Sequence, residues 1–267
     1  MKYLVLLTAA TLCVSCNSDP IKPKNSWAGR MQGTAQAFQE LMPYLYDAEK
    51  FTNPKNSKDI EKKIANYSRS IHSIDENKAK VILGDDPYIR KSLNSLKELT
   101  SRSHESFKRG DRKNSRILLK ATTNTCFKCH TRQNMGPEKM RWKNFDISTF
   151  EAFPIEKAHI YVSMRDYGKA KKTLQAFLFD SELSRKFDLS YESALHYYLM
   201  ISLRGQKTFD ETLKFLTSKT LVADAPTPLH YTLKHWQRDL KYFKKNPKQM
   251  KVTLPAIYKI IKRNKNI

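Results

Sequence analysis

Glycine, cysteine and long apolar runs are all scarce in this sequence. Seven glycines among 267 residues are too few for an architecture built on β-turns, because tight turns depend on glycine for left-handed backbone conformations. Four cysteines leave little room for a disulfide framework. After the N-terminal segment, no stretch approaches the roughly 20 apolar residues that a membrane-spanning helix needs.

Catalytic constellations are missing as well. We find no Ser/His/Asp set, no paired carboxylates and no phosphate-binding loop that rises above composition. The pair Asp85-Asp86 is interpreted as a helix start, where carboxylates complement the helix dipole. The sequence therefore does not predict an enzyme. A haem peroxidase stays open in principle, although no acid–base pair is identified beside the motif described below.

The N-terminus has the form of an export signal. Met1-Lys2 is a short positive region, and residues 3–14 are apolar with small polar residues after them. Val14-Ser15-Cys16 resembles a bacterial lipobox, although Cys13 stands where leucine is expected. We expect a lipoprotein, with cleavage nearby by the ordinary signal peptidase as the alternative. In both cases only two thiols remain unmodified, and an exported chain with no cysteine to spare uses them for something other than a disulfide.

Those two thiols lie in the run Cys126-Phe127-Lys128-Cys129-His130. C-x-x-C-H is the attachment signature of c-type haem: two thiols one helical turn apart form thioethers to the porphyrin, and the histidine presents its imidazole to the iron. A thioredoxin-like pair would need a βαβ pattern around it, and the flanking residues favour helix. A zinc site would need two more ligands at similar spacing, and no second cysteine pair exists. We therefore predict one covalent haem c.

Composition and periodicity predict an all-α protein. Lys, Leu, Ala, Glu and Ser are abundant, and apolar residues recur with a helical period. The length after the signal allows two domains. The expected segments are a signal peptide with lipobox at 1–16, a linker at 17–26, a haem domain at 27–136, a linker at 137–154, a helical repeat-like domain at 155–250 and a basic segment at 251–267.

Four helical segments precede or contain the haem motif. The first runs from about Ser26 to Phe51, and Pro43 is expected to bend it rather than end it. The second has buried positions at Ile60, Ile64, Tyr67, Ile71 and Ile74. The third has them at Ile89, Leu93, Leu96, Leu99 and Phe107, and the fourth carries Ile117, Leu118, Thr122 and the motif. Short connections predict antiparallel neighbours and an up-down-up-down four-helix bundle.

A four-helix bundle with C-x-x-C-H near the end of its last helix resembles the cytochrome c′ family (class II c-type cytochromes). The resemblance covers residues 27–140, less than half of the chain. In class I cytochromes c the motif comes first and the methionine ligand far downstream, which is the opposite order. The resemblance implies that Cys126 and Cys129 bind the porphyrin, that His130 holds the iron, and that the start of the first helix covers the distal face. Met31 occupies that level.

Met31 is therefore the candidate distal iron ligand. Met42 lies about 16 Å deeper along the helix, and Met135 and Met140 follow His130 too closely without a hairpin. Packing in the core is the alternative role of Met31, and some family members leave the iron five-coordinate. His72 and His104 are interpreted as residues of polar helix faces.

The chain departs from the family in two ways. Members often place a basic residue four after the haem histidine; here that position is Asn134, and the nearest base is Arg132. Members also usually end soon after the motif, whereas this chain continues for well over a hundred residues. The first departure puts in doubt the contact between that residue and the haem.

The remaining chain partly resembles tetratricopeptide repeats, which are helical hairpins that stack and bind a partner on a concave face. Two stretches share one spacing, the second more weakly: Ala158, Tyr161, Tyr167, Ala170 and Leu174, then Met200, Leu203, Phe209, Thr212 and Leu216. Three or more repeats are usually needed for a stable array. The alternative is a generic helical pair packed against the bundle.

Charge is distributed unevenly along the chain. The net charge is +23, and residues 241–267 carry nine bases and no acid. A solvated tail is the commoner meaning of such a run, and attraction to anionic lipid or to an acidic redox partner is the functional one. Nucleic acid is not an expected partner of an exported protein.

Together these features predict a periplasmic monohaem cytochrome, lipid-anchored through Cys16, that transfers single electrons with a redox partner protein. Two alternatives stay open. A five-coordinate haem protein would bind nitric oxide or carbon monoxide in its distal pocket. An interaction protein would use the second domain to recognise a peptide or protein, with the haem as a structural or sensing element.

Overall fold

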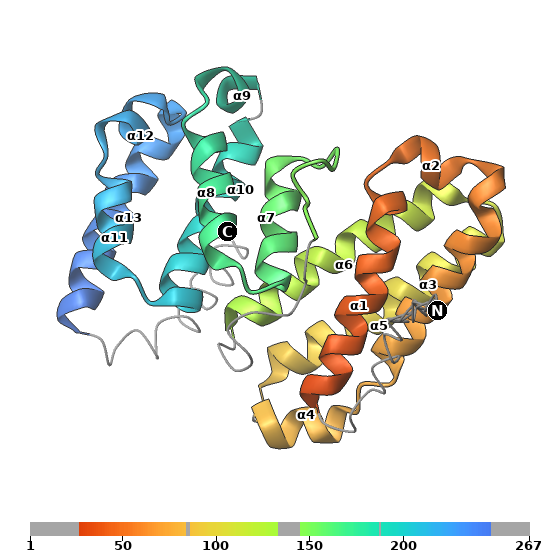
Figure 1. Cartoon of the computed structure of the whole chain (residues 1–267). Helices are drawn as coiled ribbons and strands as arrows, with labels where there is room; N and C mark the ends of the chain where they lie inside the picture. Colours follow the sequence, from red (N-terminus) through yellow and green to blue (C-terminus); the bar gives the residue numbers. More distant parts are fainter. Residues whose placement is uncertain (1–26, 84–85, 133–144, 187, 247–267) are drawn as a thin grey trace, which may run out of the picture.

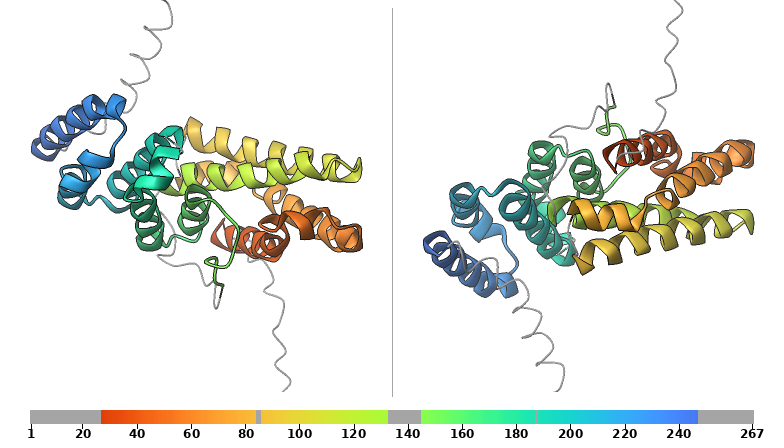
Figure 2. Two further views of the ribbon diagram at one scale, coloured as in Figure 1. Left: turned by 90° about the horizontal axis from the view of Figure 1, so that it is seen from above. Right: turned by 90° about the horizontal axis from the view of Figure 1, so that it is seen from below.

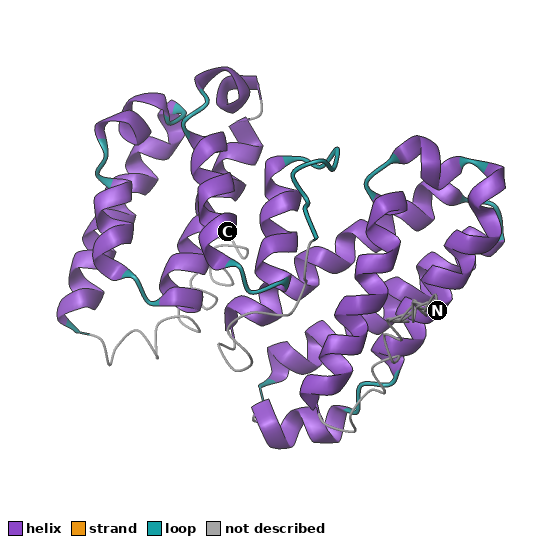
Figure 3. Ribbon diagram, in the orientation of Figure 1, coloured by secondary structure: helices purple, strands orange, loops and turns teal. Residues whose placement is uncertain are grey.

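The computed structural model describes residues 27–83, 86–132, 145–186 and 188–246. Every regular element in these ranges is helical, and no strand occurs in them (Figure 3). The predicted all-α fold class is therefore confirmed. The predicted signal segment 1–16, the linker 17–26 and the basic segment 251–267 lie outside the described residues, as do Asn134, Met135 and Met140.

The helices follow one another with short connections (Figure 1). In chain order they are α1 (Trp27–Leu45), α2 (Ala48–Thr52), η1 (Pro54–Asn56), α3 (Ser57–His72), α4 (Glu76–Leu83), α5 (Pro87–Lys108), α6 (Arg112–Arg132), α7 (Pro154–Ser163), α8 (Tyr167–Leu178), α9 (Ser181–Lys186), α10 (Asp188–Leu199), η2 (Met200–Gln206), α11 (Phe209–Leu216), α12 (Lys219–Asp224) and α13 (Thr227–Lys245). The element η1 is a 3₁₀-helix, and η2 is a π-helical continuation of α10.

The helices α1 and α3 are antiparallel neighbours. The Tyr44 hydroxyl donates a hydrogen bond to Asp59 Oδ2 (2.7 Å), which ties the end of α1 to the start of α3. At the opposite ends, the hydroxyls of Thr34 and Ser70 lie 2.9 Å apart. The two contacts fix both the direction and the register of the pair. On the other side, α3 packs on α5.

The helices α5 and α6 form the second antiparallel pair, around Gly110. This glycine has φ 86°, a left-handed conformation that ends α5 and turns the chain. The two helices approach closely through serines: the Ser103 hydroxyl lies 2.9 Å from the Ser115 hydroxyl. Where α6 begins, the Arg116 side chain donates to the Leu45 carbonyl at the end of α1 (2.7 Å). The long helices α1, α3, α5 and α6 therefore alternate in direction (Figure 1).

The structure corrects two details of the sequence prediction. The predicted first helix is broken: α1 runs through Pro43 but ends at Leu45, and Asp47 caps a separate short helix, α2. The helix α4 was not predicted. Ile117, named among the residues of the fourth helix, is 57% exposed, because α6 turns Ser115, Leu119 and Thr122 inwards. By contrast, Ile60, Ile64, Tyr67, Ile71 and Ile74 are all buried, as predicted.

The helices from Pro154 to Lys245 pack in pairs, and most of them are shorter than those of the preceding chain, although α13 spans 19 residues. The pairs are α7 with α8, α8 with α10, and α11 with α13. The two stretches predicted to share a spacing occupy equivalent places: Tyr167 begins α8 and Phe209 begins α11. Two residues before each lies a left-handed residue, Arg165 (φ 59°) or Lys207 (φ 58°). The two helical hairpins therefore repeat one turn geometry.

Two hydrophobic cores lie side by side, and α6 and α7 contribute to both. We name the contact between these two helices the α6–α7 seam. The first core comes from α1, α2, α3, α5 and α6, with Ile147 and with Ile160 of α7. The second core comes from α7 to α13 with Phe127 of α6. We call the helices α1 to α6 the first unit and the helices α7 to α13 the second unit. Both views of Figure 2 show α6 reaching from the long helices into the short ones. In the described part of the chain, no helix is long and apolar enough to cross a bilayer.

Candidate haem site

The three motif residues lie in the last turns of α6, at the α6–α7 seam. Cys126 and Cys129 are free thiols, both half-buried. His130 is 7% exposed. The helix holds Cys126 and His130 one turn apart, since side chains four residues apart share a face. The two thiols and the imidazole therefore lie together in the last turns of α6, as the sequence spacing predicts.

The surroundings of the two thiols keep both of them protonated. Burial, which is the larger effect, and the neighbouring Cys129 raise the pKa of Cys126 to about 12. Burial likewise raises the pKa of Cys129 to about 11, against the lowering effect of Arg165. Thioredoxin-like cysteines have a lowered pKa, because the thiolate is the nucleophile. This environment favours the haem interpretation over the thiol–disulfide one.

His130 is held as a neutral imidazole. Burial, which is the larger effect, and the positive charge of Arg165 lower its pKa to about 4. Its Nδ1 lies 3.3 Å from the carbonyl oxygen of Val162 in α7, so Nδ1–H donates and Nε2 keeps its lone pair. Histidine ligands of metals are commonly oriented in this way by a hydrogen bond from the second ring nitrogen. The imidazole therefore has the protonation state and the support that an iron ligand needs.

Aromatic side chains surround Cys126 on the side of the first core. The Tyr67 hydroxyl donates to Thr122 Oγ1 (3.1 Å), one turn before Cys126. Tyr46 stacks on Phe150 with ring centroids 5.7 Å apart, and its buried hydroxyl has no hydrogen-bond partner. The sequence marked Tyr67 only as a core position and did not single out Tyr46, because the periodicity that marks a core position does not say which side chain it faces.

Phe127, between the two cysteines, points the other way. It is fully buried in the second core, with ring centroids 4.9 Å from His159 and 4.8 Å from Tyr197. His159 is 6% exposed and its Nε2 is without a hydrogen-bond partner. Burial, and then Lys128, lower its pKa to about 4. The motif is thus packed on two sides, Cys126 against the first core and Phe127 in the second.

Met31 is half-buried on α1. Counted from the Arg116–Leu45 contact at the other end of these helices, Met31 and His130 each lie fourteen residues away. The imidazole of His130, however, is turned towards α7. The structure therefore does not bring the side chains of the candidate distal and proximal ligands together.

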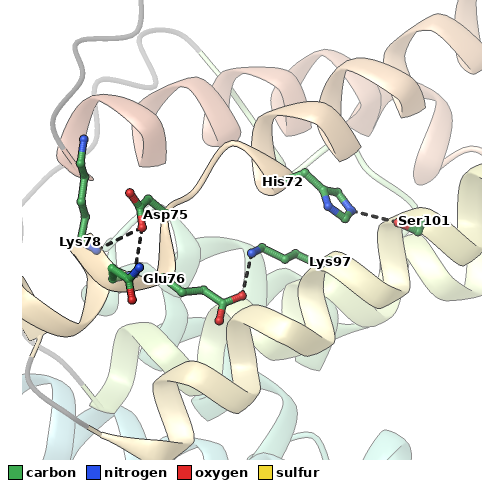
Figure 4. Close-up of polar contacts among 7 residues, drawn as sticks. His72, Asp75, Glu76, Lys78, Lys97 and Ser101 are labelled. Atoms are coloured by element: carbon green, nitrogen blue, oxygen red, sulfur yellow. Dashed lines mark hydrogen bonds and ion pairs between the residues drawn. The ribbon is translucent and has the colours of Figure 1, made fainter.

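Three other sulfur and nitrogen candidates were weighed from the sequence. Met42 is fully buried in the first core. The exposed His72 lies 2.9 Å from the Ser101 hydroxyl, among the polar contacts that Figure 4 shows. His104 Nε2 lies 3.9 Å from Glu61 Oε1 and is buried without a hydrogen-bond partner. The histidines therefore lie on partly polar helix faces, as the sequence suggested.

Charged groups gather around the end of α6. The Arg132 guanidinium is ion-paired with Asp86 at the start of α5 and lies 4.4 Å from the centroid of the Tyr88 ring. Arg165, 9% exposed, comes from the turn between α7 and α8. Arg204 of η2 has its pKa lowered by burial and by Arg132, which places it near the same group. Only Arg132 was singled out from the sequence.

The second unit has a cavity of its own, away from the motif. It measures about 480 Å³ and lies where α11 begins and α13 ends. Its walls are Lys207 to Glu211 with Phe243 and Lys244. Lys244 is ion-paired with Asp210 across it.

Among the residues that the structure describes, no three His, Cys, Asp or Glu side chains are grouped as ligands for a metal ion. A comparison of the chain with known protein families, with characterised proteins and with solved structures finds no match.

Proposed function

We propose that the chain is an exported monohaem c-type cytochrome that transfers single electrons. The observation that carries the proposal is the C-x-x-C-H motif in its environment: two free, protonated thiols on the helix that also presents a buried, neutral His130, with Nδ1 turned to a carbonyl. These residues fit a covalent haem c in number, in protonation and in spacing. A bound haem would supply the one-electron chemistry of its iron.

The protein groups have separate roles in this proposal. Cys126 and Cys129 anchor the porphyrin through thioethers, and His130 offers Nε2 to the iron. The Val162 carbonyl orients the imidazole and increases its basicity by accepting the Nδ1 proton. Tyr46, Tyr67 and the first core exclude water from the cysteine side. Ligand identity, burial and nearby charge then set the reduction potential.

The first unit is, in this proposal, a cytochrome c′-like up-down-up-down bundle of α1, α3, α5 and α6. The alternating direction of these helices supports it, as does the position of the motif on the last of them. Met31 is proposed as the distal ligand because the family resemblance assigns that place to the start of the first helix, and because Met31 and His130 lie equally far from the Arg116–Leu45 contact. A closed six-coordinate iron suits electron transfer, because no ligand has to bind or leave.

The second unit is proposed to be a tetratricopeptide-like module that binds a partner peptide or protein. The repeated hairpin turns at Arg165 and Lys207 support it. Export to the periplasm and lipid anchoring at Cys16 are proposed from the N-terminal sequence alone. The excess of positive charge favours an acidic redox partner, through steering that weakens with salt.

The test is haem attachment to the full chain, produced in a bacterium equipped for cytochrome c maturation. Intact mass and the pyridine haemochrome spectrum should both report one covalent haem. The double variant Cys126→Ala/Cys129→Ala should lose it, whereas His72→Ala should retain it. Unmodified wild-type protein under conditions that load a known c-type cytochrome would overturn the proposal.

Visible spectra with and without carbon monoxide then separate the two haem functions. Met31→Leu should convert a closed low-spin site to one that binds the gas, and Met42→Leu, on the same helix, should not. If the wild-type spectrum is already high-spin and shifts with carbon monoxide, Met31 is not a ligand and gas binding becomes the better assignment.

A further inference from the structure

The turn between α7 and α8 encloses the end of α6. From α7, the Val162 carbonyl lies 3.3 Å from His130 Nδ1. From the first residue of α8, the Tyr167 hydroxyl donates to the His130 carbonyl oxygen (3.1 Å). The second bond satisfies one of the carbonyl groups that a helix end leaves without an intrahelical partner. Both the side chain and the backbone of His130 are thus held by one hairpin of the second unit.

Tyr167 is itself fixed by close packing on η2. A Cβ added at Gly205 would lie 3.4 Å from Tyr167 Cε1, so the ring lies directly against the glycine backbone. The π-helix η2 also packs on α6. Tyr167 therefore fills the space between the haem-motif helix and η2, and its hydroxyl has a defined position.

Arg165 sits between these two contacts, in an unusual backbone conformation. It ends α7 with φ 59°; its N–H donates to the Val162 carbonyl (2.9 Å), and the Asp166 N–H donates to Tyr161 (2.8 Å). This is the helix-ending geometry for which glycine is preferred, and a side chain there costs about 1 kcal/mol. Lys207 has the same conformation in the next hairpin, but is exposed, whereas Arg165 is 9% exposed.

Arg165 lies next to the haem motif. The Val162 carbonyl accepts the backbone N–H of Arg165 (2.9 Å) and also lies 3.3 Å from His130 Nδ1. The other charged groups at this end of α6 are Arg132, its ion-pair partner Asp86, and Arg204 of η2. Three of these four side chains are positive and only Asp86 is negative, so positive charge is in excess beside His130.

We propose that the α7–α8 hairpin is part of the haem site and raises its reduction potential, with Arg165 as the charge that does so and Val162 and Tyr167 as positioning residues for His130. The inference rests on the proposed covalent haem. Ferric iron carries one more positive charge than ferrous iron, so a buried cation beside the ligand favours the reduced form. A carboxylate favours the oxidised form by the same Coulombic argument.

The experiment is a redox titration of the haem-loaded full chain and its variants, followed by visible spectroscopy. Arg165→Gln should disfavour reduction about tenfold, which for one electron is about 59 mV. Arg165→Lys should keep most of the wild-type potential, because it keeps the charge. Arg238→Gln, which removes an exposed arginine of α13, should leave the potential unchanged.

Asp86→Asn tests the same electrostatics with the opposite sign. Asp86 caps α5 through its side chain, and asparagine caps helices equally well, so the fold is expected to survive. The potential should rise. Structural damage would shift Arg165→Gln and Asp86→Asn in the same direction, whereas the charge effect shifts them in opposite directions. If Arg165→Gln does not fold, Arg165→Gly removes the same charge at a position whose φ of 59° suits glycine, and the same loss of potential is expected.

The outcomes keep the two proposals distinct. If wild-type protein carries no covalent haem, the proposed function fails, whatever the variants do. If the haem is present but Arg165→Gln and Asp86→Asn leave the potential at its wild-type value, the hairpin does not tune the iron and only this inference is overturned. A loss of potential in Arg165→Lys equal to that in Arg165→Gln would also overturn it, because packing rather than charge would then be responsible.

Discussion

The two units are held together by different means. The first unit uses long helices, with α3, α5 and α6 spanning 16, 22 and 21 residues, and its core is rich in isoleucine and large aromatic side chains. In the second unit α7, α8 and α11 span 10, 12 and 8 residues, and alanines such as Ala158, Ala170 and Ala194 line the core. Small side chains let short helices approach closely, so each short helix depends on its neighbours more than a long one does.

Because of this difference, the α6–α7 seam is important for the packing of both cores. The long helix α6 gives Leu119 to the first core and Phe127 to the second, while α7 gives Ile160 to the first and Val162 to the second. Each core therefore includes a side chain from a helix of the other unit. The second unit is therefore a wall of the candidate haem site as well as a candidate interaction module.

Removing Phe127 should have the largest effect on stability, because it breaks the seam itself. Phe127→Ala deletes a fully buried ring from the second core and is expected to lower the free energy of unfolding by about 3–5 kcal/mol. Chemical denaturation of the full chain measures this. Ile117→Ala, on the same helix but 57% exposed, should change it by no more than about 0.5 kcal/mol. Equal effects of the two substitutions would contradict the shared seam.

Truncating one leucine in each core tests whether the units unfold together. Leu45→Ala and Leu216→Ala each remove a fully buried side chain and should each cost about 2–5 kcal/mol. Since α6 and α7 belong to both cores, both variants should shift one common unfolding transition, recorded by far-ultraviolet and near-ultraviolet circular dichroism. Two separated transitions would show that the cores are independent and that the seam is only a contact.

The sequence predicted the first unit better than the second, for a physical reason. A long amphipathic helix displays its period many times, and the isoleucines of α3 were all placed correctly. Ile117 of α6, in contrast, is exposed. The inward face of α6 there carries Ser115 and Thr122, whose hydroxyls are satisfied by Ser103 and by the Leu119 carbonyl. A pattern of apolar residues cannot reveal a face on which small hydroxyl side chains are buried.

The residues of the candidate site also differ in how far the sequence predicts them. Cys126, Cys129 and His130 follow from local spacing, which sequence shows directly. Val162 and Tyr167 reach His130 across 32 and 37 residues of chain, and no local pattern marks such contacts. Arg165 is harder still, because its left-handed position is one where glycine would be expected.

Acid should destabilise the seam through His159. Its pKa in the folded state is about 4, below the value of 6.5 expected when unfolded, so the unfolded state takes up the proton first as the pH falls. Its contribution is complete above about pH 6.5, declines between there and about pH 4, and is on the order of 3 kcal/mol. Phe127, Tyr197 and the charged Lys128 face the ring, and none supplies a compensating negative charge. Unfolding free energies at pH 7 and pH 4.5 should differ less in His159→Phe than in wild type, and an unchanged difference would count against a buried neutral histidine.

The smallest effect is expected from a single hydroxyl in the first core. Tyr67→Phe removes the hydrogen bond to Thr122, which should cost about 1 kcal/mol. The cost stays low because Thr122 still donates to the Leu119 carbonyl (2.6 Å), so no buried donor is left unsatisfied. Tyr231→Phe, 71% exposed on α13, is the matched control and should be neutral in the same denaturation measurement. A loss several times larger in Tyr67→Phe would mean that this hydroxyl supports more than Thr122. Cys126 in the next turn is then the first neighbour to examine, because the Tyr67 hydroxyl also lowers the pKa of that thiol.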